Sequence, residues 1–373
     1  MNTDIDSDQR GIPCMLLRGG TSRGPFFLEA DLPADAPARD RVLLAAMGSP
    51  DPRQIDGLGG GHPLTSKVGI VRPSTTPGVD LDFLFGQLQP ASDQVDVTPN
   101  CGNMLAAVLP FALERGLLPI QEGATSARIL TLNTGMQCDV TVQTPGGKLR
   151  YGGEARIDGV PGTAAPVAIN FLDTAGSVCA SLLPTGKVRD TLQVAEGNGE
   201  PLILDATCID NGMPMVLLRA SDLQRSGYEA VAEMNADVQL KQTLEALRCA
   251  AGHLMGLGDV SARSYPKMCL VAPPRDGGTI ATRCFIPHVC HDAIGVLAAV
   301  TVATACMLEG SITEGIAQVG GGLAQSVSVE HPTGEFSVDL ELDPDNPQQV
   351  VRAALLRTAR PIMRGEVLIP QTL

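Results

Sequence analysis

A cysteine at the start of an apolar segment is the first residue that could do chemistry. Cys101 lies in the tetrapeptide Asn100–Asn103, directly before the apolar run Met104–Phe111, which predicts a buried helix. Backbone N–H groups in the first turn of a helix lack intrahelical partners, and the helix dipole favours negative charge there. A thiol so placed loses its proton more readily and can carry a carbon-bound proton. A small residue that only fills space beneath the helix fits the same pattern, so both interpretations stay open.

A lysine at the start of an apolar strand is the second candidate. Lys67 follows the glycine-rich stretch Gln54–Ser66 and precedes the strand-like run Val68–Val71. A lysine that is desolvated beside an apolar strand can act as a base near neutral pH, whereas a solvated lysine at a strand end has no such role. The glycine run lacks the GxxxxGK[ST] spacing, and no GxGxxG stands between a strand and a helix. Nucleotide binding is therefore disfavoured.

Two groups of polar residues could hold an anionic substrate. Near the start, the segment Arg18–Gly24 (RGGTSRG) supplies two guanidinium groups and two hydroxyls, which suit a carboxylate clamp as well as a plain hairpin loop. Its candidate binding residues are Arg18, Thr21, Ser22 and Arg23, to which the motifs above add Ser66, Asn100, Gly102 and Asn103. In the second half, the candidates near predicted strand ends are Lys267, Arg283, His288 and His291. These four could bind further carboxylates or be solvated loop residues.

Composition and missing motifs exclude several functional classes. The chain has 27 basic and 41 acidic residues, a net charge of −14, and no basic block that could follow a phosphate backbone, so nucleic acid is a poor partner. Ten cysteines occur without a CxxC pair, which predicts reduced thiols. Together with the polar first ten residues, which do not resemble a secretory signal, this pattern indicates a cytoplasmic protein. No HExxH or GxSxG is present, so neither a metal nor a serine hydrolase is expected, although His288 and His291 flank Cys290 closely.

The elements that must position these residues fall into two similar halves. The first half predicts strands over Cys14–Arg18, Pro25–Leu28, Lys67–Arg72, Leu81–Gln87, Ala127–Leu132, Asp139–Thr144 and Lys148–Arg156, and helices over Ala38–Met47 and Gly102–Arg115, the latter capped by Asn100. The second predicts strands over Leu202–Asp210, Met215–Arg219, Met268–Ala272 and Thr279–Phe285, and helices over Tyr228–Asn235, Val238–Ala251 and His291–Leu308. The last is a core helix, too short for a membrane span.

A weak internal repeat connects the halves. Asn100–Asn103 before its apolar run matches Val289–Asp292, with Cys290 at the same step as Cys101. We therefore expect two domains, 11–188 and 189–373.

Several separated motifs resemble the PrpF family, in family order and across about Cys14 to Arg364. They are RGGTSRG (Arg18–Gly24), MGSPDPRQIDGLGG (Met47–Gly60), TSKV (Thr65–Val68), NCGN (Asn100–Asn103), Asp210–Pro214, YPK (Tyr265–Lys267) and PHVCHDAIG (Pro287–Gly295). The resemblance implies an α+β fold like that of diaminopimelate epimerase: two pseudo-symmetric domains, each a rolled, mostly antiparallel sheet around a central helix, with the active site in the cleft between them. It also implies Lys67 and Cys101 as catalytic residues and the other motifs as anion-binding contacts. The family often has lysine where this chain has Arg23, which keeps the charge but changes its reach.

The family includes methylaconitate and aconitate isomerases and the 4-oxalomesaconate tautomerases or isomerases of gallate and protocatechuate breakdown, and the chain looks most similar to the last group. The resemblance thus implies a cofactor-independent isomerase of an unsaturated tricarboxylate, with no nucleic-acid or membrane partner, and allows a homodimer. Lys67 and Cys101 would exchange protons in a 1,3-allylic shift or a keto–enol tautomerisation, through a dienolate stabilised by the helix start and by cations such as Arg18 or Lys267. Two alternatives stay open: an epimerase that pairs Cys101 with Cys290, and a tricarboxylate-binding protein without catalysis.

Overall fold

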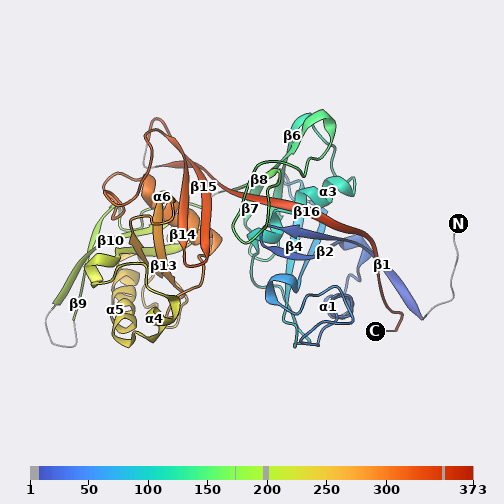
Figure 1. Cartoon of the computed structure of the whole chain (residues 1–373), viewed down its shortest axis with the longest axis horizontal. Helices are drawn as coiled ribbons and strands as arrows, with labels where there is room; N and C mark the ends of the chain where they lie inside the picture. Colours follow the sequence, from blue (N-terminus) through green and yellow to red (C-terminus); the bar gives the residue numbers. More distant parts are fainter. Residues whose placement is uncertain (1–7, 173, 196–200, 347–348, 373) are drawn as a thin grey trace. The chain divides into compact units, whose positions relative to one another are not determined.

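The computed structural model describes residues 8–172, 174–195, 201–346 and 349–372 and divides into two compact units (Figure 1). Unit 1 holds the chain up to Leu172 and the C-terminal stretch from Leu356, and unit 2 holds the chain between them. This division differs from the expected domains 11–188 and 189–373. The reason is strand pairing, because the C-terminal strand returns to pair with the first strand of unit 1, from Gln9↔Pro370 to Gly19↔Ala359.

Unit 1 is a rolled sheet with a buried helix inside it. Its strands are β1 (Gln9–Gly19), β2 (Ser22–Leu28), β3 (Lys67–Pro73), β4 (Leu81–Leu88), β5 (Val95–Asp96), β6 (Gly123–Thr131), β7 (Gln137–Thr144), β8 (Pro166–Phe171) and the later part of β16 (Val350–Pro370). Its helices are α1 (Ala36–Met47), α2 (Gly102–Leu105) and α3 (Val108–Glu114), with short 3-10 turns at Glu29–Asp31, Pro63–Thr65 and Pro145–Gly147. The sheet order is β1-β2-β3-β4-β6-β7-β8-β16, and β16 also pairs with β1, which closes the ring.

The core of unit 1 lies on both sides of this sheet. Every residue from Val108 to Leu113 of α3 is buried, and Phe111 packs on Phe26 of β2 with ring centroids 5.7 Å apart. Helix α1 covers the opposite face, where Val42 and Leu43 join a second cluster with Cys14. Alternate residues of β1 therefore serve two apolar layers, as a strand period of two requires.

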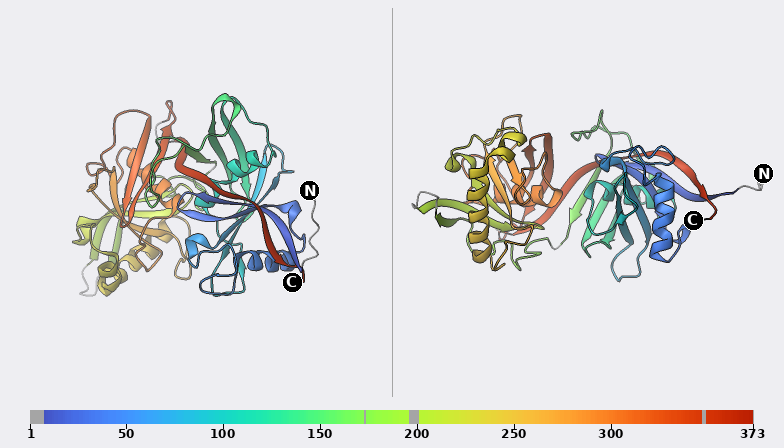
Figure 2. Two further views of the ribbon diagram at one scale, coloured as in Figure 1. Left: turned by 45° about the vertical axis from the view of Figure 1, so that its right-hand side comes forward. Right: turned by 90° about the horizontal axis from the view of Figure 1, so that it is seen from below.

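Unit 2 repeats this architecture. Its strands are β9 (Asp190–Ala195), β10 (Pro201–Asp210), β11 (Pro214–Arg219), β12 (Lys267–Ala272), β13 (Ile280–Phe285), β14 (Ala324–His331), β15 (Gly334–Leu342) and the start of β16. Its helices are α4 (Val231–Ala236), α5 (Val238–Leu254) and α6 (Val296–Met307), with a 3-10 turn at Ala220–Leu223. Helix α6 is buried from Ala298 to Ala305, and α5 lies along the outside of the unit (Figure 2).

The pairing pattern shows the internal repeat directly. Strands β1-β2-β3-β4-β6-β7-β8 pair as antiparallel, parallel, antiparallel, parallel, antiparallel and antiparallel. Strands β10-β11-β12-β13-β14-β15-β16 follow the same series. Lys67 begins β3 and Lys267 begins the corresponding β12. The expected α+β class, with a rolled sheet around a central helix in each unit, is confirmed.

Local boundaries differ from expectation at several places. The helix predicted over Gly102–Arg115 is split into α2 and α3 by two residues, and its N-cap is Cys101 rather than Asn100. Lys148–Arg156 is a loop with a single bridge, Ala155↔Ala164, although the N–H of Arg150 donates to the carbonyl oxygen of Gln143 on β7 at 3.0 Å. The helices predicted from Tyr228 and His291 begin at Val231 and Val296.

Both late starts have local causes. The N–H groups of Ser226 and Gly227 donate to the Glu229 carboxylate, which holds a turn ahead of α4. The His291 ring accepts from the N–H of Ala293, and Gly295 is extended at the N-cap of α6. In the part of the chain that the structure describes, no helix is long and apolar enough to cross a membrane.

Candidate active site

Lys67 is a buried amine at the first position of β3. Its side chain is only 8% exposed, and Nζ donates to Oε1 of Gln87, its register partner on β4, at 2.5 Å. Nζ also lies 5.0 Å from the centroid of the Phe85 ring. The Gln87 amide is oriented because its Nε2 lies 3.0–3.1 Å from the carbonyl oxygens of Pro63, Ser66 and Leu88. Among the described residues no carboxylate pairs with Lys67, so its partners are a neutral amide and an aromatic face.

The loop before Lys67 is held by its own hydrogen bonds. Gln54 is 1% exposed, and its Oε1 accepts from the Ser66 hydroxyl at 2.7 Å and from the N–H of Gly61 at 3.0 Å. The Ser66 hydroxyl also lies 2.8 Å from the carbonyl oxygen of His62. Ser66, a predicted binding residue, is thus occupied inside the loop that fixes the entry to β3.

Cys101 occupies the N-cap of α2 in an extended conformation, with φ −135° and ψ 99°. Its thiol makes no capping hydrogen bond, and the residue is half-buried. The carbonyl oxygen of Cys101 accepts from the N–H of Leu105, so the helix begins directly after the cysteine. The N–H groups of Gly102 and Asn103 lie in this first turn, where intrahelical acceptors are missing.

The hairpin between β1 and β2 packs against the backbone of Lys67 and against α2, the helix that begins after Cys101. A Cβ atom added to Gly24 would lie 1.8 Å from the carbonyl oxygen of Lys67 and 3.3 Å from the methyl group of Met104 in α2. A Cβ atom on Gly20, whose φ is +50°, would lie 2.0 Å from Oδ1 of Asn103. Only glycine permits these approaches. The structure therefore brings RGGTSRG, the start of β3 and the start of α2 together within unit 1.

Asn103 fastens the helix start to its surroundings. Its Nδ2 donates to the Thr21 hydroxyl at 3.0 Å, and its Oδ1 accepts from Nε of Arg357 at 3.2 Å. Both bonds cross long stretches of sequence and join β16, α2 and the β1–β2 turn. Thr21 and Asn103 thus act first as anchors that fix the Cys101 segment.

Three buried polar atoms around these segments have no hydrogen-bond partner among the described residues. They are Oγ of Ser22, which is 1% exposed, Nε of Arg23 and Oδ1 of Asn100. The Asn100 amide nitrogen is used, since Nδ2 donates to the Thr134 hydroxyl. An unpaired buried polar group costs about 1–3 kcal/mol. Ser22 and Arg23 adjoin Gly24, and Asn100 adjoins Cys101, so a bound ligand here would find donors and an acceptor in place.

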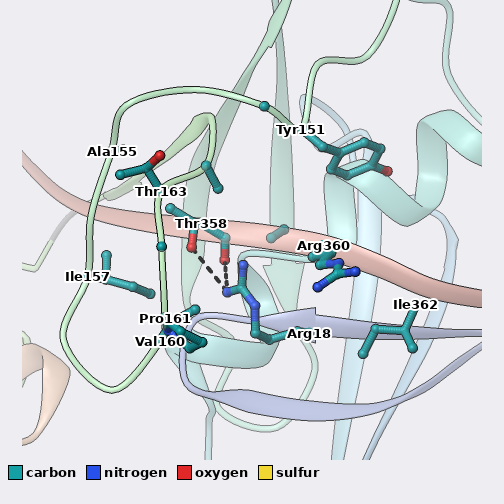
Figure 3. Close-up of a pocket in the computed structure, with 14 residues that line it drawn as sticks. Arg18, Tyr151, Ala155, Ile157, Val160, Pro161, Thr163, Thr358, Arg360 and Ile362 are labelled. Carbon is teal, nitrogen blue, oxygen red and sulfur yellow. Dashed lines mark hydrogen bonds between the residues drawn. The ribbon is translucent and has the colours of Figure 1, made fainter.

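Arg18 has a different environment from the other predicted binding residues. Its Nη1 donates to the carbonyl oxygens of Gly20 and Thr358 and to the Thr358 hydroxyl, at 2.7–3.1 Å. It lines a pocket of about 440 Å³ together with Arg360 (Figure 3). Burial, with a smaller effect of the neighbouring Arg360 charge, lowers the pKa of Arg18. Neither Lys67 nor Cys101 lines this pocket.

In unit 2, Lys267 and Arg283 are half-buried cations. Burial lowers the pKa of Lys267, whose Nζ would lie 3.8 Å from a Cβ atom on Gly295, the N-cap of α6. Arg283 donates from Nε to the carbonyl oxygen of Glu229 at 2.8 Å and from Nη1 to that of Thr282 at 2.9 Å. Arg283 thus uses two of its donors within the unit, whereas the described residues provide no hydrogen-bond acceptor to the Lys267 amine.

His288 and His291 are both exposed. Nδ1 of His288 lies 3.4 Å from a carboxylate oxygen of Glu245, and Nδ1 of His291 accepts from the N–H of Ala293. Within the described residues no cluster of three or more His, Cys, Asp or Glu residues is arranged to hold a metal ion. The two histidines act as surface and turn residues in this geometry.

Cys290 is more buried than Cys101. It is 2% exposed, and burial raises the pKa of its thiol to about 11. Asn235 fixes its backbone by accepting from the N–H of Cys290 at 2.7 Å and donating to its carbonyl oxygen at 3.3 Å. A thiol with this pKa stays protonated at neutral pH, which argues against Cys290 as the base of a two-thiol epimerase.

Two neighbours of predicted residues were not predicted from the sequence, one beside Lys67 and one beside Arg18 in its separate pocket. Gln87 orients Lys67, and Arg360 faces Arg18. The alternation of β4 shows that Gln87 points to one definite face, but only the register of β3 and β4 places it opposite Lys67. Arg360 belongs to a strand that the sequence patterns did not predict.

Comparison with known proteins gives the family. Residues 9–370 match the protein family PrpF, which is described as PrpF protein. It is 53% identical to the (4E)-oxalomesaconate Delta-isomerase of Novosphingobium sp. (strain KA1), over 98% of this chain and 99% of that protein. It is 52% identical to the 4-oxalomesaconate tautomerase of Pseudomonas putida, over 97% of each. A solved methylitaconate-delta-isomerase matches with a TM-score of 0.86 at 34% identity, covering 98% of this chain and 97% of that one. Since these matches span nearly the whole chain, the protein belongs to the PrpF family.

Proposed function

We propose that the protein is a cofactor-independent isomerase of 4-oxalomesaconate that moves protons on the substrate's carbon skeleton with Lys67 and Cys101. The observation that carries this proposal is the packing of the β1–β2 hairpin against the backbone of Lys67 and against α2, the helix that begins after Cys101. Gly24 contacts Lys67 and α2, so a buried amine that has no carboxylate partner among the described residues and a helix-start thiol belong to one local framework. The substrate follows from the 52–53% identity to relatives with that named activity.

The chemistry uses one residue of the pair as base and the other as acid. The base removes a proton from a carbon that the neighbouring carbonyl and alkene make acidic, and the pair of electrons moves into a dienolate. The acid then delivers a proton to the far carbon, so the C=C bond shifts by one position. One proton leaves and one is added, so substrate and product are isomers and no cofactor is needed. The N–H groups of Gly102 and Asn103 would stabilise the developing negative charge, as donors that need no reorganisation.

The unpaired donors near Gly24 supply the carboxylate contacts in this proposal. Ser22 and Arg23 would each give a buried donor to a substrate carboxylate, and the pairing would satisfy atoms that have no partner among the described residues. In unit 2, Lys267 is the predicted binding residue that the structure supports best, while Arg283 and the two histidines have internal partners. We place the enzyme in the cytoplasm, in the breakdown of gallate-type aromatic compounds.

A keto–enol tautomerisation of 4-oxalomesaconate is the second candidate reaction. It needs the same acid and base with a different substrate pose, and the Pseudomonas putida relative is named a tautomerase. Methylitaconate isomerisation is a further candidate from the 34% identity to the solved isomerase, and methylaconitate isomerisation from the 34% identity to the 2-methyl-aconitate isomerase of Shewanella oneidensis. The greater identity to the 4-oxalomesaconate enzymes favours the first assignment.

Proton NMR in D2O tests the proposal. The protein is incubated separately with 4-oxalomesaconate, aconitate and methylitaconate, and the vinyl and methylene signals are followed. Migration of the C=C bond in 4-oxalomesaconate with deuterium uptake is the expected result, and keto–enol interconversion without migration would identify the tautomerase. Faster conversion of aconitate or methylitaconate would reassign the substrate. Thermal stabilisation by a tricarboxylate without any exchange would replace the enzyme with a binding protein.

A further inference from the structure

Three arginines occupy neighbouring positions across three strands of unit 1. Arg18 on β1 is the register partner of Arg23 on β2 and of Arg360 on β16. Directly opposite like charges destabilise an antiparallel pair, and this chain as a whole is acidic, with a net charge of −14. Solubility alone does not explain a row of adjacent cations in such a protein, so a role in binding an anion has to be considered.

Arg18 and Arg360 differ from five other arginines of unit 1 in their partners. Carboxylates pair with Arg39, Arg72, Arg115, Arg128 and Arg364. In the described part of the chain, neither Arg18 nor Arg360 has a carboxylate within ion-pair distance. The hydrogen bonds of Arg18 use Nη1 alone, which leaves Nε and Nη2 available. Two guanidinium groups are therefore open to an anion.

Arg18 and Arg360 face a common pocket of about 440 Å³, which we call the arginine pocket. Figure 3 shows both side chains between β1, β16 and the loop that carries Ala155 and Thr163. Among the described residues that line it there is no aspartate or glutamate, and Thr163 and Thr358 add hydroxyls. This volume lies in the range of small-molecule sites.

The remaining wall of the arginine pocket is apolar. Its larger apolar side chains are those of Ile157, Val160, Pro161 and Ile362, and Tyr151 also lines it. A bare inorganic anion would leave this wall without a partner, whereas a short carbon chain would cover it. Planar guanidinium groups bind carboxylates in a bidentate manner. We propose that the arginine pocket binds a small organic anion with at least two carboxylates, one on Arg18 and one on Arg360.

This binding site is additional to the proposed reaction site. Lys67 and Cys101 do not line the pocket, and Arg360 has no part in the acid–base chemistry proposed above. The lowered pKa of Arg18, caused by burial and then by the Arg360 charge, is consistent with a site that gains from a bound anion. The inference does not depend on the proposed substrate, because binding is measured without turnover.

Calorimetric titration of tricarballylate, a saturated tricarboxylate that has no C=C bond to move, tests the proposal. The full chain is compared with Arg360→Gln and with Arg10→Gln, a matched control that removes an exposed arginine of β1 outside the pocket. The expected result is that Arg360→Gln weakens one class of sites at least tenfold, while Arg10→Gln binds as wild type does. Turnover of 4-oxalomesaconate at saturation by Arg360→Gln is expected to equal that of wild type.

Three results would overturn the proposal. Unchanged affinity and stoichiometry in Arg360→Gln would show that the arginines do not hold the ligand. Inorganic phosphate that competes as well as tricarballylate at equal ionic strength would show a general anion site without preference for carbon. Purely competitive inhibition of turnover, with an inhibition constant equal to the Arg360-dependent Kd, would make the pocket part of the reaction site. Failure of the isomerase assay alone leaves the titration valid, so the two proposals fail separately.

Discussion

Replacing Gly24 with alanine should disturb the proposed acid–base pair without touching either residue. An added Cβ atom would lie 1.8 Å from the carbonyl oxygen of Lys67, whereas such contacts are essentially never below 3.0 Å. The strands β2 and β3 must therefore separate locally by more than 1 Å. A misplacement of about 1 Å can cost roughly 100-fold in rate, equivalent to about 2.7 kcal/mol of transition-state stabilisation. Overpacking should also lower the free energy of unfolding by about 1–3 kcal/mol.

The assay is steady-state kinetics with 4-oxalomesaconate, accompanied by thermal unfolding and circular dichroism. Gly321→Ala is the matched control, because Gly321 is exposed, has an ordinary φ and has no heavy atom within 4 Å of its Cβ position. We expect kcat/KM to fall about 100-fold in folded Gly24→Ala and to stay at the wild-type value in Gly321→Ala. Wild-type kcat/KM in a folded Gly24→Ala protein would refute the argument that this contact sets the position of Lys67.

Three further predictions concern individual side chains. Gln87→Leu removes the acceptor of Lys67 Nζ and should lower kcat/KM about tenfold in steady-state assays, with wild-type kinetics as the contrary result. Iodoacetamide at pH 8 should label Cys101 before Cys290, because burial raises the pKa of Cys290 to about 11; equal labelling by mass spectrometry would contradict this. Burial lowers the pKa of Lys267 below its ordinary 10.5. At pH values between the lowered pKa and 10.5, the unfolded state therefore binds more protons than the folded state. Wild-type Tm should therefore rise with pH there, and Lys267→Met should raise Tm at pH 8 and flatten that slope; an unchanged slope would refute this.

Strand alternation made much of the fold predictable. Segments such as Lys67–Arg72 and Met268–Ala272 combine β-branched or apolar residues with clear turn signals, and both are strands in the structure, β3 and β12. Strand β16 was missed because it serves two units. Its buried residues cluster at Ala353–Leu355 and Arg357–Ala359 and then alternate only near Val367 and Ile369. No single period describes such a strand, and its pairing with β1 is what places the stretch from Leu356 in unit 1.

The candidate site, too, could be predicted from the sequence only in part. Local motifs were enough to single out Lys67 and Cys101, because each stands at the boundary between a polar loop and an apolar element. The partners of these residues depend on long-range pairing, which local sequence does not contain. Gln87 is 20 residues from Lys67, and Arg357 is 254 residues from Asn103, yet both pairs are hydrogen-bonded. The pocket with Arg360 likewise exists only because β16 returns to β1.

An acidic protein with a proposed anionic substrate also raises a question of local charge. The unpaired Nε of Arg23 and the unpaired hydroxyl of Ser22 lie on β2, where Gly24 contacts Lys67. Cations and donors at close range outweigh a diffuse negative charge, because salt screens distant charges within about 10 Å. The local arrangement, rather than the net charge of the chain, decides which ligand binds.

The central claim is that Lys67 and Cys101 carry the migrating proton. The most direct measurement is C=C migration and deuterium uptake in D2O by Lys67→Met and Cys101→Ser, compared with Lys148→Met, which removes an exposed lysine, and Cys249→Ser, which removes another half-buried thiol. Both site variants should lose migration at least about 100-fold, the usual contribution of a general acid or base, while the two controls keep the wild-type rate. Migration at the wild-type rate in either site variant would contradict the account.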